Sequence, residues 1–486
     1  MAENGQVPVL HRVLGVRDLV LLNIAAVVGL RWLSTAAQIG PSSLVLWSLA
    51  LLVFFIPLAL TVLELSSRLP GEGGLYLWSK AAFGDLHGFV AGWSYWISNM
   101  VFFPTLLLFL AGVSIYIAGD RWLSLAGNVF YNGAYCLVAL WAATILNIFG
   151  LERAKWLQNI GGLATWLTTA LILVCAGVAW HRFGAATRIT AGNVLPDFGS
   201  LSTFSTLAII AGAYTGMELG PILGGEIRDP RTTIPRAILI AGILIAAIYL
   251  LGTAALLVAL PTRQIDVIAG IPQALAAVGN RIGLPFFGSL TAMLLTLASL
   301  GGLGAWITGT ARLPLVVGVD RYLPRPLAAL HPKYATPHVA LLTQATIVSI
   351  ILIAMLSGSA IHEAYAMLID MTLILTFIPL LYLFAALPVL RRRSTGDEVG
   401  IALVPGGMLG CWLVSGMGLA MTLLTIVTSL VPPDHTAHPG VFFVKVCGGS
   451  FLLLGVGLAF YARGRGARAV AALQAGETDV VNQPAS

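Results

Sequence analysis

The chain has 486 residues, of which 58% are hydrophobic and only 9% are charged, and its formal net charge at pH 7 is +6. About a quarter of the residues in a soluble domain are charged, so this chain could not cover a water-facing surface of its size. The composition excludes a water-soluble globular protein and predicts helices that lie mostly in lipid.

Long uncharged stretches predict twelve membrane-spanning helices. A helix needs about 20 mostly apolar residues to cross a bilayer, and these runs are continuous rather than alternating as in a membrane β-barrel. The polar first 17 residues precede an apolar run too long for a signal peptide, so we expect that run to remain as the first helix. The expected all-α spans are 18–39, 44–66, 86–117, 129–149, 156–179, 202–224, 235–260, 285–312, 338–357, 363–389, 403–430 and 441–461.

The positive charge is distributed asymmetrically between the predicted loops. With an even number of spans both tails share one side, and that side receives nineteen Lys and Arg residues against five on the other. Such a bias marks the cytoplasmic side, so we expect a multi-pass plasma membrane protein, of the bacterial inner membrane, with both termini in the cytoplasm. The same distribution argues against a nucleic acid partner.

Sequence motifs for cofactors are missing. The four cysteines lie in apolar spans without the spacing of a metal or redox motif, and no phosphate-cradling Gly-Lys-Ser/Thr motif occurs. We therefore expect no cofactor, no metal and no ATP-driven step within this chain.

The first predicted span is interrupted. In the stretch 23–32, Gly29 and Arg31 fall inside the apolar run. An arginine near the bilayer centre costs about 3 kcal/mol on insertion scales, so such a residue usually faces a water-filled cavity or a partner. A break in the helix near Gly29 is expected.

The sixth predicted span is interrupted in the same way. The stretch 211–221 places three glycines, Pro221 and the carboxylate of Glu218 inside one apolar run. Backbone groups released from helical bonding are not tolerated against lipid, so they line protein or a polar cavity. A single glycine in a membrane helix is more often a packing residue, but a charge beside glycine at two matching positions favours two breaks.

The two interrupted spans each open a group of five helices, which predicts an inverted repeat. A short amphipathic segment follows the second helix of each group, at 71–83 on the inside and at 265–278 on the outside. Interrupted helices at corresponding places in two halves indicate a transporter binding site. The expected organisation is an N-terminal tail (1–17), a first repeat (18–179), a second repeat (202–389), two further helices (403–461) and a C-terminal tail (462–486).

Several motifs resemble those of the amino acid–polyamine–organocation permeases. They are Gly216-Met217-Glu218, the segment from Gly225 to Arg236 with its Glu226, Asp229-Pro230 and Pro235, Gly40-Pro41 after the first helix, Glu64 to Tyr76 after the second, and Thr310-Ala311-Arg312 with Asp320 to Pro324 after the eighth. The likeness runs from about residue 12 to 460 and, within the family, is similar to the bacterial glutamate–GABA antiporter branch. The family usually has a small residue where Arg31 stands.

This resemblance implies a five-plus-five inverted repeat of the LeuT type, with two extra C-terminal helices, that moves amino acids by alternating access. Physical chemistry fits that expectation independently. A half-helix that begins at a break offers free N–H groups and a positive dipole end to a carboxylate, and a half-helix that ends there offers carbonyls to an ammonium.

Candidate site residues gather around the two breaks. Asn99 and Leu303 enter by their resemblance to positions in arginine–agmatine antiporters, and Glu218 matches a proposed proton sensor there. The expected substrate-binding residues are Val28, Gly29, Leu30, Arg31, Trp32, Asn99, Tyr214, Thr215, Gly216, Met217 and Leu303; the expected proton-coupling residue is Glu218; and the expected gating residues are Trp32, Tyr214 and Trp306.

Alternatives stay open for three of these residues. Arg31 pairs with Glu218, binds a substrate carboxylate, or extends its charged end toward the vestibule. Asn99 contacts substrate or bonds between helices. Glu218 carries a proton or holds backbone N–H groups freed at the break.

The sequence predicts a secondary transporter of amino acids, zwitterionic α-amino acids foremost, as an antiporter or proton-coupled symporter. Its partners would be an amino acid or amine substrate, lipid and protons. A polyamine or organic-cation transporter on the same fold is the alternative, and acidic amino acid–GABA exchange is a lesser one. We expect no enzymatic activity, because clustered His or Asp ligands are missing, and no channel, because no polar stripe follows a whole span.

Overall fold

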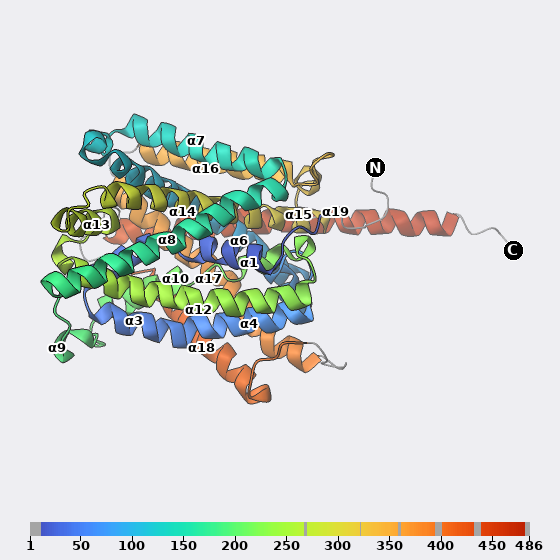
Figure 1. Ribbon diagram of the computed structural model, residues 1–486. Coiled ribbons are helices and arrows are strands. Elements are labelled where there is room, and N and C mark those ends of the chain that lie inside the picture. The colour runs from blue at the N-terminus through green and yellow to red at the C-terminus, as the bar shows by residue number, and fades with distance from the viewer. Residues whose placement is uncertain are drawn as a thin grey trace.

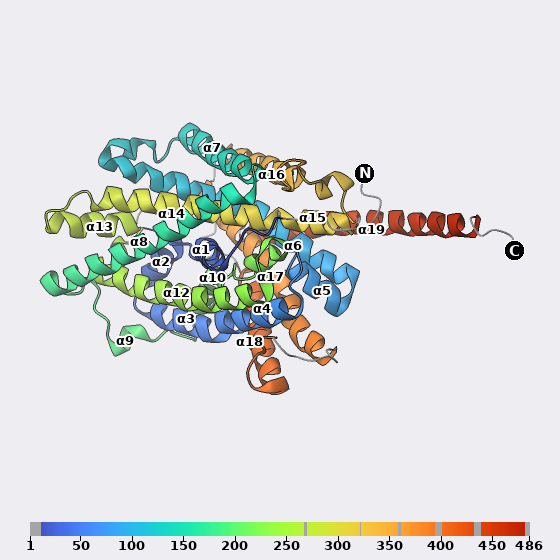
Figure 2. The ribbon, with the colours of Figure 1, turned by 45° about the vertical axis from the view of Figure 1, so that its right-hand side comes forward.

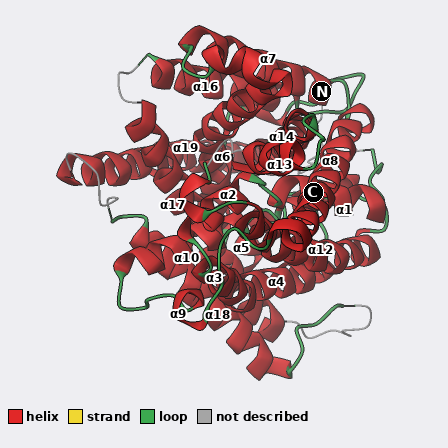
Figure 3. Cartoon of the chain, turned by 60° about the vertical axis from the view of Figure 1, so that its left-hand side comes forward, coloured by secondary structure: helices red, strands yellow, loops and turns green. Residues whose placement is uncertain are grey.

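A computed structural model describes residues 11–266, 270–320, 322–357, 361–393, 401–431 and 439–481. Within these ranges the chain consists of helices and connecting loops, and the one β-type contact is an isolated bridge between Leu14 and Ile227 (Figure 3). The apolar composition therefore leads to a helical membrane protein, as expected.

The helices differ greatly in length. Three interruptions concern the site: α1 and α2 are separated at residues 28–30, α3 and α4 are joined by one π-helical turn, and α10 and α11 are separated at residues 214–218. The helices are α1 (Val16–Val27), α2 (Arg31–Ile39), α3 (Ser42–Ala50), α4 (Ile56–Arg68), α5 (Leu75–Phe83), α6 (Asp85–Ser114), α7 (Val129–Ile148), α8 (Leu151–Phe183), α9 (Ala191–Val194), α10 (Leu201–Ala213), α11 (Leu219–Ile222), α12 (Pro230–Ala259), α13 (Gly270–Arg281), α14 (Phe287–Thr310), α15 (Arg312–Val319), α16 (His338–Leu356), α17 (Ile361–Arg393), α18 (Gly407–Thr428) and α19 (Pro439–Val481).

Ten helices in the described residues are long and apolar enough to cross a membrane, and the bent pair α1–α2 makes an eleventh if it is one span. The remaining predicted span, 202–224, corresponds to the 13-residue α10, a turn and the short α11. The structure thus shows a multi-pass membrane protein whose two atypical spans are the two that the sequence marks as interrupted.

The long helices run side by side, and α1 lies in the middle of the bundle, packed against α8, α12 and α14 (Figures 1 and 2). Helix α14 approaches α8 closely because glycines face each other: a Cβ at Gly161 would lie 2.4 Å from the Cα of Gly301. Small residues allow such contacts between membrane helices. Gly302 likewise faces the carbonyl of Ala25 at the end of α1, so α14 holds the first break from one side.

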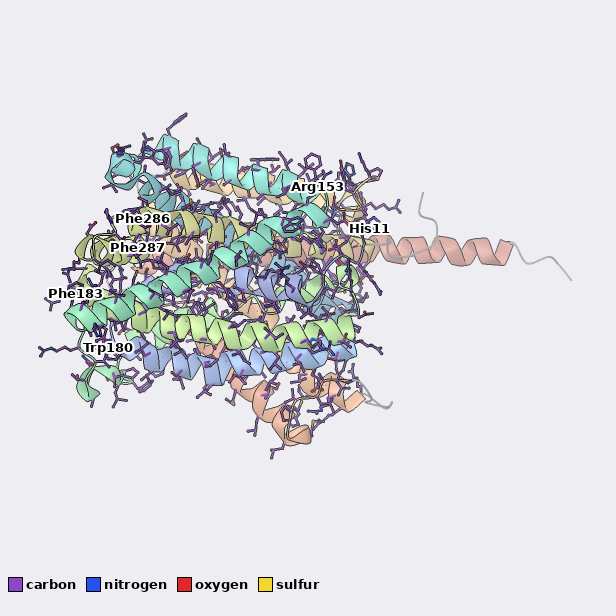
Figure 4. The ribbon with its side chains drawn as sticks, viewed as in Figure 1. His11, Arg153, Trp180, Phe183, Phe286 and Phe287 are labelled. Atoms are coloured by element: carbon purple, nitrogen blue, oxygen red, sulfur yellow. The ribbon has the colours of Figure 1, made fainter. Side chains whose placement is uncertain are left out.

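The two ends of the bundle differ in character. His11 and Arg153 lie at one end, whereas Trp180, Phe183, Phe286 and Phe287 gather at the other (Figure 4). Trp180 is 68% exposed, as expected for an aromatic residue at a membrane–water interface. The short helices α5 and α13, which correspond to the two segments expected to lie at the interface, occupy opposite ends of the molecule (Figure 2).

Candidate functional site

The first break separates α1 from α2 and bends the pair by 45°. Val28 leaves the helical conformation, and the turn closes by hydrogen bonds from the Gly29 N–H to the Val27 carbonyl and from the Trp32 N–H to the Gly29 carbonyl. Glycine is required at position 29 because a Cβ there would lie 2.8 Å from the Trp32 ring. The break therefore lies where the sequence predicts it.

The second break follows α10. Gly216 has a φ of +116°, in the left-handed region that favours glycine. A Cβ at this position would lie 3.1 Å from the ring of Trp306 and 3.2 Å from the Val27 side chain. The two breaks therefore contact each other directly, and glycine permits that approach.

A cavity of about 90 Å³ lies between the two breaks, several times the space that one water needs. Three further helices, α6, α14 and α17, complete its wall. The lining residues are Ala25, Ala26, Val27, Val28, Gly29, Leu30, Arg31, Trp32, Asn99, Phe102, Thr105, Leu106, Phe109, Gly212, Ala213, Thr215, Ala298, Ser299, Gly302, Trp306, Ile369, Thr372, Leu373, Thr376 and Phe377.

Arg31 is the lining residue that carries a charge. It is the first residue of α2 and is only 4% exposed. Its guanidinium stacks on the rings of Trp32, at 4.5 Å, and Phe102, at 5.0 Å. Because the N-terminus of α2 also presents its positive dipole end here, this part of the cavity favours an anionic group.

Glu218 lies behind the second break rather than on the cavity wall, and it is fully buried. Its carboxylate accepts hydrogen bonds from Tyr95 Oη, at 2.8 Å, and from the Gly216 N–H, at 3.0 and 3.1 Å. Among the described residues no ion pair joins it to Arg31. The carboxylate thus holds the backbone of the break and links it to α6.

Trp306 connects α14 to the first break. Its Nε1 donates a hydrogen bond to the Ala26 carbonyl at 2.9 Å, and its ring lies against those of Tyr95 and Phe102. Trp306 lines the cavity together with Trp32, while Tyr95 connects it to Glu218. These contacts join the breaks, α6 and α14 into one unit.

Asn99 combines both roles that the sequence left open. It lines the cavity, and its Nδ2 donates to the Tyr95 carbonyl one turn earlier in α6, at 2.8 Å. That bond fixes the side chain on its own helix rather than on a neighbouring one. Its remaining polar valences are therefore oriented by α6.

Four of the expected substrate-binding residues lie outside the cavity lining: Tyr214, Gly216, Met217 and Leu303. Tyr214, expected also as a gating residue, is fully buried and stacks on Phe55. Leu303 lies outside because Gly302 and Trp306, one turn apart, face the cavity, and one residue further along a helix points about 100° away. The other expected residues, 28–32, 99, 215 and 306, line the cavity.

Tyr249 in α12 is a site residue that the sequence reasoning missed. Its Oη accepts a hydrogen bond from the Gly29 N–H at 3.2 Å and lies 2.6 Å from the Val27 carbonyl oxygen and 2.8 Å from that of Ala213. The hydroxyl therefore connects both breaks. The one signal in the sequence is that this is the only tyrosine in an otherwise apolar span.

A second polar cluster lies near the start of α15. Arg312 is fully buried and pairs with both carboxylate oxygens of Glu226, at 2.9 and 3.0 Å, while it also donates to the Thr308 carbonyl. Glu72 accepts from the Gly225 N–H. Burial and the negative charge of Glu226 raise the pKa of Glu72 to about 8, opposed by Arg312 and this hydrogen bond.

The arginines expected to join that cluster behave differently. Arg231 and Arg236 are exposed, and Arg228 donates to the Arg12 carbonyl on the surface. The backbone of residues 13 and 14 bonds to the Glu226 carbonyl, so the segment before α1 is attached to the loop after α11. In the part of the chain that the structure describes, no group of three His, Cys, Asp or Glu residues could hold a metal ion.

Comparison with known proteins shows transporters along most of the chain. The model of the family described as amino acid permease matches residues 14–452. An uncharacterized transporter of Legionella pneumophila is 31% identical over 89% of this chain and 93% of its own length. An uncharacterized transporter of Mycobacterium tuberculosis is 29% identical over 70% and 73%, and a probable agmatine/putrescine antiporter of Lactococcus lactis is 29% identical over 56% and 57%.

Proposed function

The chain belongs to the amino acid permease family, and from that membership we propose that it is a secondary active transporter that binds amino acids in the cavity between its two broken helices. The observation that carries the proposal is the cavity itself, whose wall includes residues 27–31 at the first break and residues 212–215 at the second. Transport would proceed by alternating access, as antiport or proton-coupled symport. Hydrolysis or other enzymatic chemistry is not part of the proposal.

The carboxylate of an amino acid would bind at Arg31. The guanidinium and the N-terminus of α2 supply positive charge at one place, and a guanidinium can bond both oxygens of a carboxylate. The ammonium group would bind at the carbonyls of residues 212 and 213, where α10 ends; a carbonyl oxygen that already accepts one hydrogen bond retains a second lone pair. This pairing suits zwitterionic α-amino acids.

Glu218 would couple the cavity to protons. It is a buried carboxylate on the wall of the second break, and its partners are neutral donors, Tyr95 and the Gly216 N–H. Ionisable residues inside membranes commonly serve as proton sites. A change of protonation would alter the hydrogen bond that fixes the Gly216 turn, and through that turn the contact with Trp306.

The inverted arrangement of two five-helix halves is also a proposal. It is supported by the interruption of the first and sixth spans and by the short helices α5 and α13 at opposite ends. We propose that both termini lie in the cytoplasm of a bacterial cell with the protein in its inner membrane, because the end that carries Arg153 is the more basic by sequence.

Transport of polyamines or other organic cations is a second candidate, favoured by the similarity to a probable agmatine/putrescine antiporter. A dication would need anionic groups around the cavity. Among its lining residues the charged one is Arg31, which repels cations. The charge of the cavity therefore favours amino acids over polyamines, and acidic amino acid–GABA exchange is tested in the same experiment.

Counterflow in liposomes that contain the purified protein tests the proposal. The panel comprises neutral amino acids, glutamate, GABA, agmatine and putrescine, each at two pH values. Neutral amino acids are expected to exchange fastest. Exchange of agmatine and putrescine alone would support the second candidate, and no exchange of any compound would overturn both.

A further inference from the structure

A second cavity of about 280 Å³ lies between α10, α17 and α18. It belongs to the end of the bundle where α9 precedes α10, away from the cluster of Glu226 and Arg312 (Figure 1). Its polar lining consists of one carboxylate and five hydroxyl groups, from Ser202, Ser205, Thr206, Asp370, Thr428 and Ser429. No basic residue is among its lining residues.

Asp370 is a half-buried carboxylate inside a membrane-spanning segment, where a charge is costly unless it is paired. Neither a hydrogen bond nor an ion pair connects it to any described residue. The other buried acids of the described spans have such partners: Glu218 has Tyr95, and Glu64 has Arg68. Asp370 therefore faces the cavity without the compensation that the fold gives to comparable carboxylates.

The hydroxyls around Asp370 are equally uncommitted. Ser429 is 4% exposed and its Oγ has no hydrogen-bond partner among the described residues. Ser205 and Thr206 form no hydrogen bond in the part of the chain that is described, and Thr428 donates back to its own helix, which leaves its oxygen free to accept. Oxygen acceptors around one carboxylate, with no basic side chain, suit a cation.

The second cavity adjoins the one between the breaks. Leu373 lines both of them, and its side chain lies where a Cβ at Gly212 would be, 2.5 Å away. A leucine packed on a glycine at the end of α10 is thus the partition between the two spaces. A rotation of this one side chain would connect them.

We propose that the cavity at Asp370 is an outer binding site for the ammonium group of a small amine or amino acid, occupied before the substrate passes Leu373. This inference rests on the proposed function. An ammonium group has three N–H donors that match the carboxylate and the hydroxyl oxygens. The cavity is much larger than a bare metal ion, whose five or more oxygen ligands would have to surround it closely, so an organic ammonium fits the space better.

Binding of ethylammonium chloride to the full chain in lipid nanodiscs tests the site, measured by saturation-transfer NMR with sodium chloride at equal ionic strength as reference. Asp370→Asn is expected to weaken ethylammonium binding about tenfold or more, and Ser429→Ala to weaken it less. Asp197→Asn is the matched control, because Asp197 is an exposed acid on the loop before α10. Its Asn can still accept from the Gly199 N–H.

Unchanged ethylammonium binding in both Asp370→Asn and Ser429→Ala would overturn the proposal, as would displacement of ethylammonium by equimolar sodium, which would make this a metal-cation site. If Asp370→Asn does not fold, the Ser205→Ala/Thr206→Val variant replaces it with the same expected loss. The measurement needs no transport. Asp370-dependent binding without any counterflow would leave the site standing and remove the proposed function, and the reverse result would do the opposite.

Discussion

The hydroxyl oxygen of Tyr249 lies 2.6 Å from the carbonyl oxygen of Val27, the last residue of α1. A hydroxyl has one proton to donate, and the Ala213 carbonyl at 2.8 Å competes for it. The same oxygen accepts from the Gly29 N–H. One side chain of α12 thus satisfies backbone groups that both breaks release inside the membrane, where unsatisfied groups are costly.

Tyr249→Phe is expected to slow exchange by about tenfold or more. Loss of a buried hydrogen-bond partner costs about 1 to 3 kcal/mol, and each 1.4 kcal/mol or so corresponds to about a factor of ten in rate. Counterflow with a transported amino acid measures the loss. The matched control is Tyr214→Phe, because the Tyr214 Oη has no hydrogen-bond partner in the described part of the chain. Equal rates in the two variants would show that Tyr249 does not hold the breaks.

Glu218→Gln is expected to abolish the pH dependence of exchange while retaining transport. Glutamine has the shape of the glutamate and can still accept from Tyr95 Oη, but it cannot take up a proton. Initial rates of exchange between about pH 5 and pH 8 measure the effect. Glu152→Gln, at an exposed acid near the start of α8, is the control. A variant with the full pH response of the native chain would remove Glu218 as the proton site.

Arg31→Ala is expected to raise the KM for neutral amino acids about tenfold, which corresponds to the loss of one charge-assisted hydrogen bond. Arg31→Lys should fall between the two, because lysine keeps the charge but loses the planar stacking on Trp32 and Phe102. Uptake at several substrate concentrations separates KM from kcat.

Arg153→Ala is the control for Arg31, since Arg153 also lies against two aromatic rings, Phe149 and Tyr334, but far from the cavity. Unaltered KM for neutral substrates in Arg31→Ala would exclude the arginine from carboxylate binding. If KM rises for glutamate alone, Arg31 reads the substrate side chain rather than its α-carboxylate.

Hydropathy and glycine position predicted the broad fold and both breaks. Charge is expensive in lipid, so uncharged runs mark the spans, and the predicted interruptions at Gly29 and Gly216 correspond to a 45° bend and a positive φ. The sequence also placed Glu218 beside the second break. These features depend on local chemistry, which a single chain displays directly.

Rotation of the helices could not be predicted in the same way. A continuous apolar span has no polar face from which to tell which side is buried, so Tyr249 passed as one more apolar residue and Leu303 was chosen by its resemblance to another family branch. The placement of Leu303 away from the cavity depends on the contact between Gly302 and the Ala25 carbonyl, which orients α14. Such contacts join segments far apart in the sequence.

Glu72 is expected to make the stability of the protein depend on pH near neutrality. Its pKa of about 8 in the folded chain exceeds its ordinary value of 4.5, because the carboxyl is buried near the negative Glu226. Between these two values the folded state binds more protons than the unfolded state. Stability therefore falls as the pH rises from about 5 to about 8, by at most about 1.4 kcal/mol per pH unit.

Glu72→Gln tests this expectation, because glutamine imitates the protonated carboxyl and its oxygen can still accept from the Gly225 N–H. The melting temperature in nanodiscs, measured at half-unit steps of pH, should decline less steeply in the variant than in the native chain. The difference should be greatest near pH 8, where native Glu72 has begun to ionise beside Glu226. A variant whose melting curve follows the native one at every pH would show that Glu72 does not titrate in this window, and Asp197→Asn controls for the loss of one acid.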